Sequence, residues 1–269
     1  MIDIVVASTS NAADLGYRAL ADLATAAEGL DYRVVGGHMV QLLLHAYPTP
    51  EAQKSARATS DADAGIERPL AIGQDIHHRL LELGYTPHGN RYEKKSADSP
   101  PESLAVDLLV PRTSTEKTAI LGDRAFDAIP GLNLAMAAEP TMIAANIRLT
   151  RGQYLTFTVP VPNPEAALVL KALAWKSRNA PKDLTDISSL LELAYLHSAS
   201  FVWKLNQADH VRKGDRRDAA HALIMLKTLL TEQRIPPAPS RSEPARMAAL
   251  IHRLVLNPQA APSTIVLPK

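Results

Sequence analysis

The sequence predicts an α+β domain over residues 1–162, followed by a helical domain over residues 163–269. In the first part, short apolar stretches typical of strands alternate with segments of helical periodicity, and in the second part only helical periodicity remains. The change falls at the proline-rich stretch 160–164, where Asn163 suits a helix N-cap and Pro164 suits the first helical position.

The first part contains three predicted helices and six predicted strands. Leu15, Leu20 and Leu23 recur at helical spacing ahead of Gly29, and Gly84 closes a later helical stretch. The strands are short apolar runs bounded by turn residues. We expect helices at 11–29, 38–46 and 70–83, and strands at 32–35, 59–66, 85–93, 104–110, 142–149 and 154–161.

The second part contains five predicted helices. Pro236, Pro237 and Pro239 interrupt the helical pattern between the last two, and the tail after Asn257 has the composition of a loosely ordered end. We expect the helices at 164–178, 182–197, 199–209, 216–231 and 242–255.

Composition narrows the class of protein. The chain of 269 residues is 46% hydrophobic and contains no cysteine, which excludes disulfides, thiolate zinc sites and cysteine nucleophiles. It has no run of eighteen apolar residues, and its start lacks the basic residues of a signal peptide, so we expect a soluble, cytoplasmic protein with no membrane association. Residues 1–163 carry 14 Lys and Arg against 19 Asp and Glu, whereas residues 164–269 carry 15 against 9. An acidic first part suits metal binding and a basic second part suits phosphate-rich partners, although ordinary surface variation explains the asymmetry equally well.

Three aspartates form the strongest chemical signal in the first part. Asp61 and Asp63 are two residues apart, so on a strand both side chains point to the same face. Asp107 interrupts the apolar run 104–110, where a carboxylate is costly unless it is paired or bound to metal. Together they predict an all-oxygen site for Mg²⁺ or Mn²⁺. The alternatives are that the D-x-D pair is incidental and that Asp107 either sits at a strand end or faces an arginine.

Gly36 and Gly37 follow the strand at 32–35 and precede a helix. Glycines there allow backbone amides to approach a phosphate at a helix N-terminus, where the helix dipole also favours anions. The order of glycines, D-x-D pair and strand aspartate is more specific than any one of them.

The first two predicted helices of the second part carry two cations and two acids. Lys171 and Arg178 are seven residues apart and share a helix face, and Asp183 and Asp186 lie three apart on the next helix. Cations beside a triphosphate offset its charge as pyrophosphate leaves. The alternative is a salt bridge between neighbouring helices.

These blocks resemble the AbiEii/AbiGii toxins and their MenT-like relatives, within the polymerase β-type nucleotidyltransferase superfamily. The quoted motifs are VVGGHMVQLLLH with RATSDADAGI, then LAVDLLVP, then VLKALAWKSRNAPKDLTDI, which together span residues 34–187. The resemblance implies a polymerase β-like domain with a mixed sheet, followed by a helical domain that contributes Lys171 and Asp186 to the cleft.

The resemblance also implies a role for each residue that matches its motifs. The implied metal ligands are Asp61, Asp63 and Asp107, and the implied catalytic residues are these three with Lys171 and Asp186. The implied nucleotide-binding residues are Gly36, Gly37, His38, Thr59, Lys171, Arg178 and Asp183. The chain departs from the pattern at His38, where many superfamily members have serine, so His38 either substitutes for that hydroxyl or merely begins the helix.

The resemblance finally implies an activity and two partners. The activity is transfer of NMP from an NTP to the 3′ end of tRNA, which blocks translation, and the partners are tRNA and a cognate antitoxin. The basic segment 211–217 either holds an RNA backbone or is a solvated loop. The alternatives are an enzyme that modifies a protein hydroxyl or a small molecule such as an aminoglycoside, and an inactive binding module.

Overall fold

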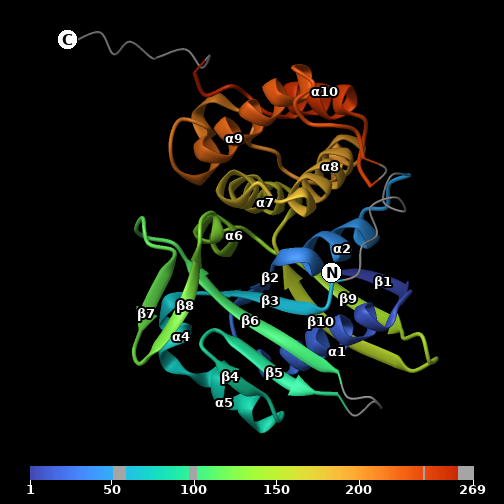
Figure 1. The fold of residues 1–269 in the computed structure, drawn as a ribbon, viewed down its shortest axis with the longest axis vertical. Helices are drawn as coiled ribbons and strands as arrows, with labels where there is room; N and C mark the ends of the chain where they lie inside the picture. The colour runs from blue at the N-terminus through green and yellow to red at the C-terminus, as the bar shows by residue number, and fades with distance from the viewer. Residues whose placement is uncertain (51–58, 97–101, 239, 260–269) are drawn as a thin grey trace.

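The fold is α+β, with mixed sheets in the first part of the chain and helices stacked over them in the second part (Figure 1). The computed structural model describes residues 1–50, 59–96, 102–238 and 240–259. Where the structure describes the chain, no helix combines the length and the apolar character needed to cross a membrane.

A seven-stranded mixed sheet forms the centre of the first part. Its strands follow the order β2-β3-β6-β5-β4, with β8 beside β6 and β7 beside β8. β3 runs parallel to β6, and β6 runs parallel to β8, whereas the other pairs are antiparallel. The strands are β2 (Tyr32–Val34), β3 (Asp61–Ile66), β4 (Thr86–His88), β5 (Arg91–Lys95), β6 (Ser103–Pro111), β7 (Thr118–Leu121) and β8 (Arg124–Ile129).

A second sheet has the order β1-β9-β10, from β1 (Ile2–Ala7), β9 (Thr141–Arg148) and β10 (Tyr154–Val161). Helix α1 (Asn11–Ala26) packs against β3, β6 and β10 and so joins the two sheets. Its apolar stripe includes Leu20 and Leu23, which are fully buried, and Ser10 caps it by accepting a hydrogen bond from the amide of Ala13.

Four α-helices make up most of the described chain after residue 163: α7 (Pro164–Arg178), α8 (Pro181–Leu196), α9 (Gly214–Thr231) and α10 (Pro244–Leu254). As predicted, the Asn163 side chain caps α7 by accepting from the amide of Ala166. Helix α7 packs against α8 and α9, and α8 packs against α2 (Gly36–Ala46) of the first part. These contacts place α7 between the first part of the chain and helix α9 (Figure 1).

Three predicted elements are wrong. The helix expected at 70–83 is two helices, α4 (Arg68–Gly73) and α5 (Asp75–Glu82), because Gln74 has a φ of 63° and breaks the helix. The strand expected at 85–93 is the hairpin of β4 and β5, which turns at Gly89 with a φ of 66°.

The third error is the helix expected at 199–209, where the structure has two short 3₁₀ turns, Ser198–Ser200 and Ala208–His210. The buried carboxylate of Glu165 accepts hydrogen bonds from the amides of Lys204 and Leu205, so these amides are not available to a helix. Four elements of the described residues were not expected at all: β1, β7, β8 and α6 (Leu132–Ala137). The predicted loose tail falls largely outside the described residues, as does Pro239.

Candidate functional site

The parallel pairing of β3 with β6 brings the three predicted aspartates into one cavity. Asp63 is the register partner of Asp107, and Asp61 lies two residues earlier on the same face of β3. All three line a cavity of about 670 Å³ between the sheet and α7. The cavity is also lined by Gly36, Gly37, Thr59, Ser60, Asn90, Arg91, Arg112, Asp127, Lys171, Arg178 and Lys182.

Gly36 allows the backbone at the start of α2 to lie directly against Asp63. A Cβ atom at residue 36 would lie 1.7 Å from Oδ2 of Asp63, and the φ of Gly36 is 67°, a conformation that favours glycine. The amide of Val35 donates to the carbonyl of Asp63 over 2.9 Å. The glycine is therefore required for the position of this carboxylate, in addition to any contact with phosphate.

Lys171 brings a positive charge from α7 to the carboxylates. Its side chain is 5% exposed, and Nζ lies 2.7 Å from Oδ2 of Asp186 and 3.9 Å from Oδ1 of Asp183. Arg178 makes a two-pronged contact with Asp183, at 2.6 and 2.7 Å. Both acids are buried behind the cations and neither lines the cavity. The sequence left open whether these cations face a bound nucleotide or form a salt bridge between helices. In the structure they do both: Lys171 and Arg178 line the cavity and also pair with acids of α8.

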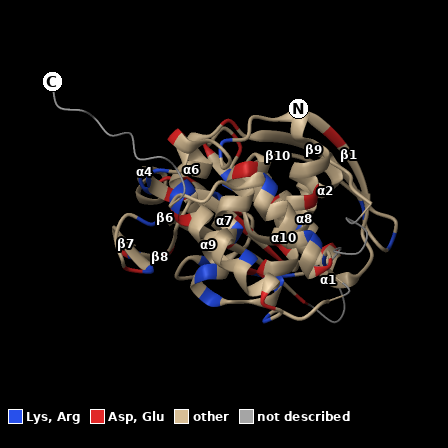
Figure 2. Cartoon of the chain, turned by 90° about the horizontal axis from the view of Figure 1, so that it is seen from above, with Lys and Arg blue, Asp and Glu red and all other residues tan. Residues whose placement is uncertain are grey.

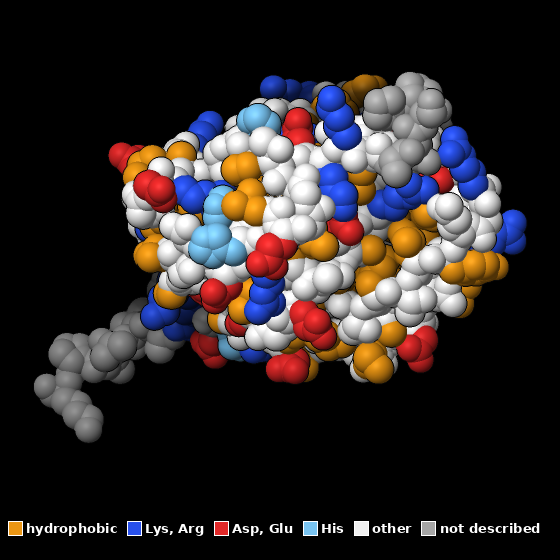
Figure 3. All heavy atoms as spheres, turned by 90° about the horizontal axis from the view of Figure 1, so that it is seen from below, with side chains coloured by type: hydrophobic (Ala, Val, Ile, Leu, Met, Phe, Trp, Pro, Cys, Tyr) orange, Lys and Arg blue, Asp and Glu red, His pale blue; other side chains and the backbone are white. Residues whose placement is uncertain are grey.

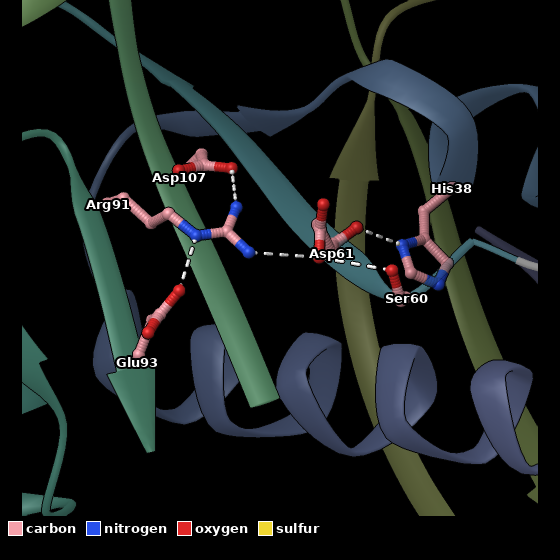
Figure 4. A network of polar contacts seen from close by, with 6 residues as sticks. All are labelled: His38, Ser60, Asp61, Arg91, Glu93 and Asp107. Atoms are coloured by element: carbon pink, nitrogen blue, oxygen red, sulfur yellow. Dashed lines mark hydrogen bonds and ion pairs between the residues drawn. The ribbon is translucent and has the colours of Figure 1, made fainter. Parts of the chain in front are cut away.

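Arg91 is the main residue of the site that the sequence did not indicate. Its guanidinium lies between two of the aspartates, with Nη1 2.9 Å from Oδ2 of Asp107 and Nη2 3.4 Å from Oδ1 of Asp61 (Figure 4). Its Nε donates to Glu93 over 2.8 Å. Asp107 therefore faces an arginine, one of the alternatives left open by the sequence, because Arg91 on β5 is its register partner on β6.

Burial and the closeness of the carboxylates raise the pKa values of Asp63 and Asp107. The pKa of Asp63 is raised from 3.8 to about 6, first by burial and then by the charge of Asp107, while Lys171 opposes the shift and Asp61 adds to it. Burial also raises the pKa of Asp107, and Arg91 opposes that shift. Around Asp63, burial and the neighbouring carboxylates outweigh the effect of the nearby lysines, so an added cation at this point would be favoured.

The donor set fits a hard divalent cation, since carboxylate oxygens are the ligands that Mg²⁺ and Mn²⁺ prefer. Asp61, Asp63 and Asp107 would hold it. Among the described residues, however, no three acidic or histidine side chains stand close enough together to hold an ion as they are. Arg91 lies between two of the three.

His38 and Thr59 take different positions. His38 is 1% exposed, its Nδ1 lies 3.0 Å from the carbonyl oxygen of Asp61, and its ring packs against Tyr17. It lies beside Asp61 at the start of β3, outside the lining of the cavity, so its geometry favours a packing role (Figure 4). Thr59 does line the cavity, and its hydroxyl accepts a hydrogen bond from Gln41 over 3.2 Å.

The central sheet adds a fourth carboxylate that the sequence analysis missed. Asp127 on β8 is the register partner of Leu109, which lies on the same face of β6 as Asp107. Arg112 and Lys182 add positive charge to the same cavity. Only the register of β8, an element not expected from the sequence, could have indicated Asp127.

A mixed sheet that presents paired aspartates to a cavity closed by a basic helix is the arrangement of a nucleotidyltransferase. The model of the AbiEii family, described as a nucleotidyl transferase toxin of a type IV toxin–antitoxin system, matches residues 18–260. The chain belongs to this family.

No curated protein matches the sequence. Among solved structures, the antibiotic-resistance factor ANT(2″)-Ia is similar, with 11% identity over 81% of this chain and 95% of that one, at a TM-score of 0.37. A likeness of this size carries no functional argument.

Proposed function

We propose that this AbiEii-family protein transfers NMP from an NTP to the 3′ end of tRNA, using Mg²⁺ or Mn²⁺, and that this blocks translation in the cytoplasm. The observation that carries the proposal is the convergence of Asp61, Asp63 and Asp107 on one cavity with Lys171. A toxin of this kind requires an antitoxin, which we expect as its second partner.

The side chains of the cavity suit the chemistry of nucleotidyl transfer. The 3′ oxygen of the acceptor bonds to the α-phosphorus, the bond from that phosphorus to the bridging oxygen breaks, and pyrophosphate leaves. Asp107 accepts the proton of the 3′ hydroxyl, and its raised pKa makes it a better base than an exposed aspartate. Lys171 and Arg178 offset the charge of the leaving pyrophosphate. When bound, the divalent ions supply Lewis-acid stabilisation of the phosphate oxygens.

Charge distribution supports an acceptor of phosphate-rich character. Seen from above, the helical part carries Lys and Arg on several helices, including α9 (Figure 2). The opposite face, seen from below, intersperses acidic, basic and apolar side chains (Figure 3). Within the basic segment 211–217, Arg212, Arg216 and Arg217 form ion pairs with acids of the chain, so this segment alone is a weak argument for RNA.

The test is incubation of the full chain with α-labelled NTPs, Mg²⁺ and total tRNA. We expect label at tRNA 3′ ends, its loss in Asp61→Ala, and its retention in Asp3→Asn, which removes an exposed acid on the other sheet. Label on protein or on an aminoglycoside would replace tRNA as the acceptor. The absence of any transfer, with unchanged growth of cells expressing either protein, would favour an inactive binding module.

The antitoxin is tested separately, by growth. Expression of the chain alone should slow growth, and co-expression of the gene adjacent to it should restore growth. Sequencing of RNA 3′ ends in both cultures shows whether recovery follows loss of the modification.

A further inference from the structure

We infer that Arg91 is a positioning residue that occupies the place of the divalent cation in the metal-free protein and must turn toward Glu93 when the cation binds. This role rests on the proposed function, because it concerns the same three aspartates. The guanidinium contacts Asp107 and Asp61 at once, at 2.9 and 3.4 Å. It therefore bridges a carboxylate of β6 and a carboxylate of β3, as a bound cation would.

The surroundings of Arg91 show where it goes. Glu93 lies two residues along β5, on the same face, and already accepts from Nε over 2.8 Å. The side chains of Arg91 and Glu93 are 36% and 40% exposed, so their pairing does not have to be rebuilt in a buried space. Arg91 can thus keep one carboxylate partner while it releases the other two.

Of the two contacts that must break, the one to Asp61 is weak, whereas the one to Asp107 is short, at 2.9 Å, and the Asp107 side chain is only 17% exposed. The contact to Asp61 is long, at 3.4 Å, and the side chain of Asp61 is 42% exposed, so solvent screens this pair. A divalent cation carries twice the charge of a guanidinium and prefers oxygen ligands, so it displaces Arg91 once both ligands are free to turn. Asp63 makes no contact with Arg91 among those described and is ready to complete the ligand set.

The inference explains why the described acids do not yet form a metal cluster. Three carboxylates share one cavity, yet no three acidic or histidine side chains of the described chain are close enough to hold an ion. The guanidinium neutralises two of them and keeps their oxygens directed at itself. Removing it leaves the carboxylates facing one another with no cation between them.

The decisive experiment is calorimetric titration of the nucleotide-free full chain with Mn²⁺. Arg91→Gln should bind Mn²⁺ roughly tenfold more tightly than the wild type, a change of the size seen when groups around a metal site are altered. The matched control is Lys95→Gln, which removes the same charge from the same face of β5 about 13 Å away and should leave the affinity nearly unchanged.

A second variant tests the direction of movement. Glu93→Gln removes the alternative partner of Arg91, so Mn²⁺ should bind several-fold more weakly, and this loss should largely vanish when Arg91→Gln is also present. Melting of the metal-free proteins gives a readout that does not depend on activity: Arg91→Gln should melt lower than the wild type and recover with Mn²⁺.

The outcomes separate this role from the proposed function. If the wild type binds Mn²⁺ and Arg91→Gln binds it no more tightly, the role of Arg91 is overturned and the metal site stands. If neither protein binds Mn²⁺, with or without an NTP, the proposed metal mechanism fails and the role of Arg91 fails with it. Binding that survives Asp63→Asn would place the ion elsewhere and overturn both.

Discussion

Asp63→Asn should stabilise the metal-free protein, and the size of the effect follows from the position of this carboxylate. In the folded chain its pKa is raised from 3.8 to about 6, chiefly by burial and by the charge of Asp107. Since one pKa unit corresponds to about 1.4 kcal/mol, ionised Asp63 costs the fold about 3 kcal/mol. Asparagine has nearly the same shape and carries no charge, so it removes this cost.

The sign gives the pH dependence. A group whose pKa is higher in the folded state stabilises the fold below its unfolded pKa of 3.8, and this contribution is lost as pH rises through about 6. The wild type should therefore match Asp63→Asn near pH 4 and fall below it by about 3 kcal/mol near pH 8.

Urea unfolding in EDTA at pH 4, 6 and 8 measures this difference, with Asp3→Asn on the exposed face of β1 as the control. Added Mn²⁺ should stabilise the wild type and not Asp63→Asn. A variant that is no more stable than the wild type at pH 8, or a difference that does not grow with pH, would refute the electrostatic reasoning.

Three further predictions concern the groups around this carboxylate. Lys171→Met should slow nucleotidyl transfer by about 100-fold. It should also lower the free energy of unfolding by about 3 kcal/mol, because Asp186 stays buried without its closest cation. Single-turnover labelling measures the rate and urea unfolding measures the stability. Adding Asp186→Leu to Lys171→Met should restore stability without restoring transfer, and restored transfer would contradict the role given to Lys171. Gly36→Ala should abolish transfer, because the added Cβ would collide with the carboxylate of Asp63. Gly122→Ala is the control: its φ is 64° and no atom lies within 4 Å, so it should lose only about 1–2 kcal/mol of stability from backbone strain. Equal stability losses and equal rates for the two glycine variants would show that the close contact is unimportant. His38→Ser should destabilise the protein by about 2–4 kcal/mol through an unfilled cavity and leave KM for the NTP unchanged; a raised KM with unchanged stability would assign His38 to the nucleotide instead.

The sequence predicted those parts of the site that depend on local spacing. The two-residue interval of Asp61 and Asp63 defines a strand face, and the seven-residue interval of Lys171 and Arg178 defines a helix face, whatever the rest of the chain does. Their contacts with Asp183 and Asp186 lie between adjacent helices and could also be proposed from spacing.

The residues that were missed depend on strand register. Arg91 reaches Asp107 because β5 pairs antiparallel with β6, and Asp127 reaches the cavity because β8 pairs parallel with the end of β6. Neither pairing is encoded within a short window. β1 was missed for a different reason: it is an outer strand in which Ile4 and Val6 are buried but Val5 between them is 79% exposed, so its apolar residues do not all mark burial.

Two of the three wrongly predicted elements were divided by a single residue, and the third was decided by tertiary hydrogen bonds. Gln74 and Gly89 adopt positive φ values, and each divides a stretch that looked continuous by composition. At residues 199–209, Leu205 is buried and Trp203 is partly buried without either being helical, since Trp203 donates to the carbonyl of Leu254 and Glu165 accepts from the neighbouring amides. Apolar periodicity reports burial, and tertiary hydrogen bonds decide the backbone.

The lining of the cavity contains four aspartates and five arginines and lysines, so opposite charges nearly cancel within it. A free nucleoside triphosphate would bring about four negative charges and leave this space with an excess of negative charge, and free divalent ions would leave it with an excess of positive charge. A nucleotide that arrives already complexed with its cations disturbs the balance least. Under the proposed function, the protein selects for the metal–nucleotide complex as a single ligand, and saturation should follow the concentration of that complex.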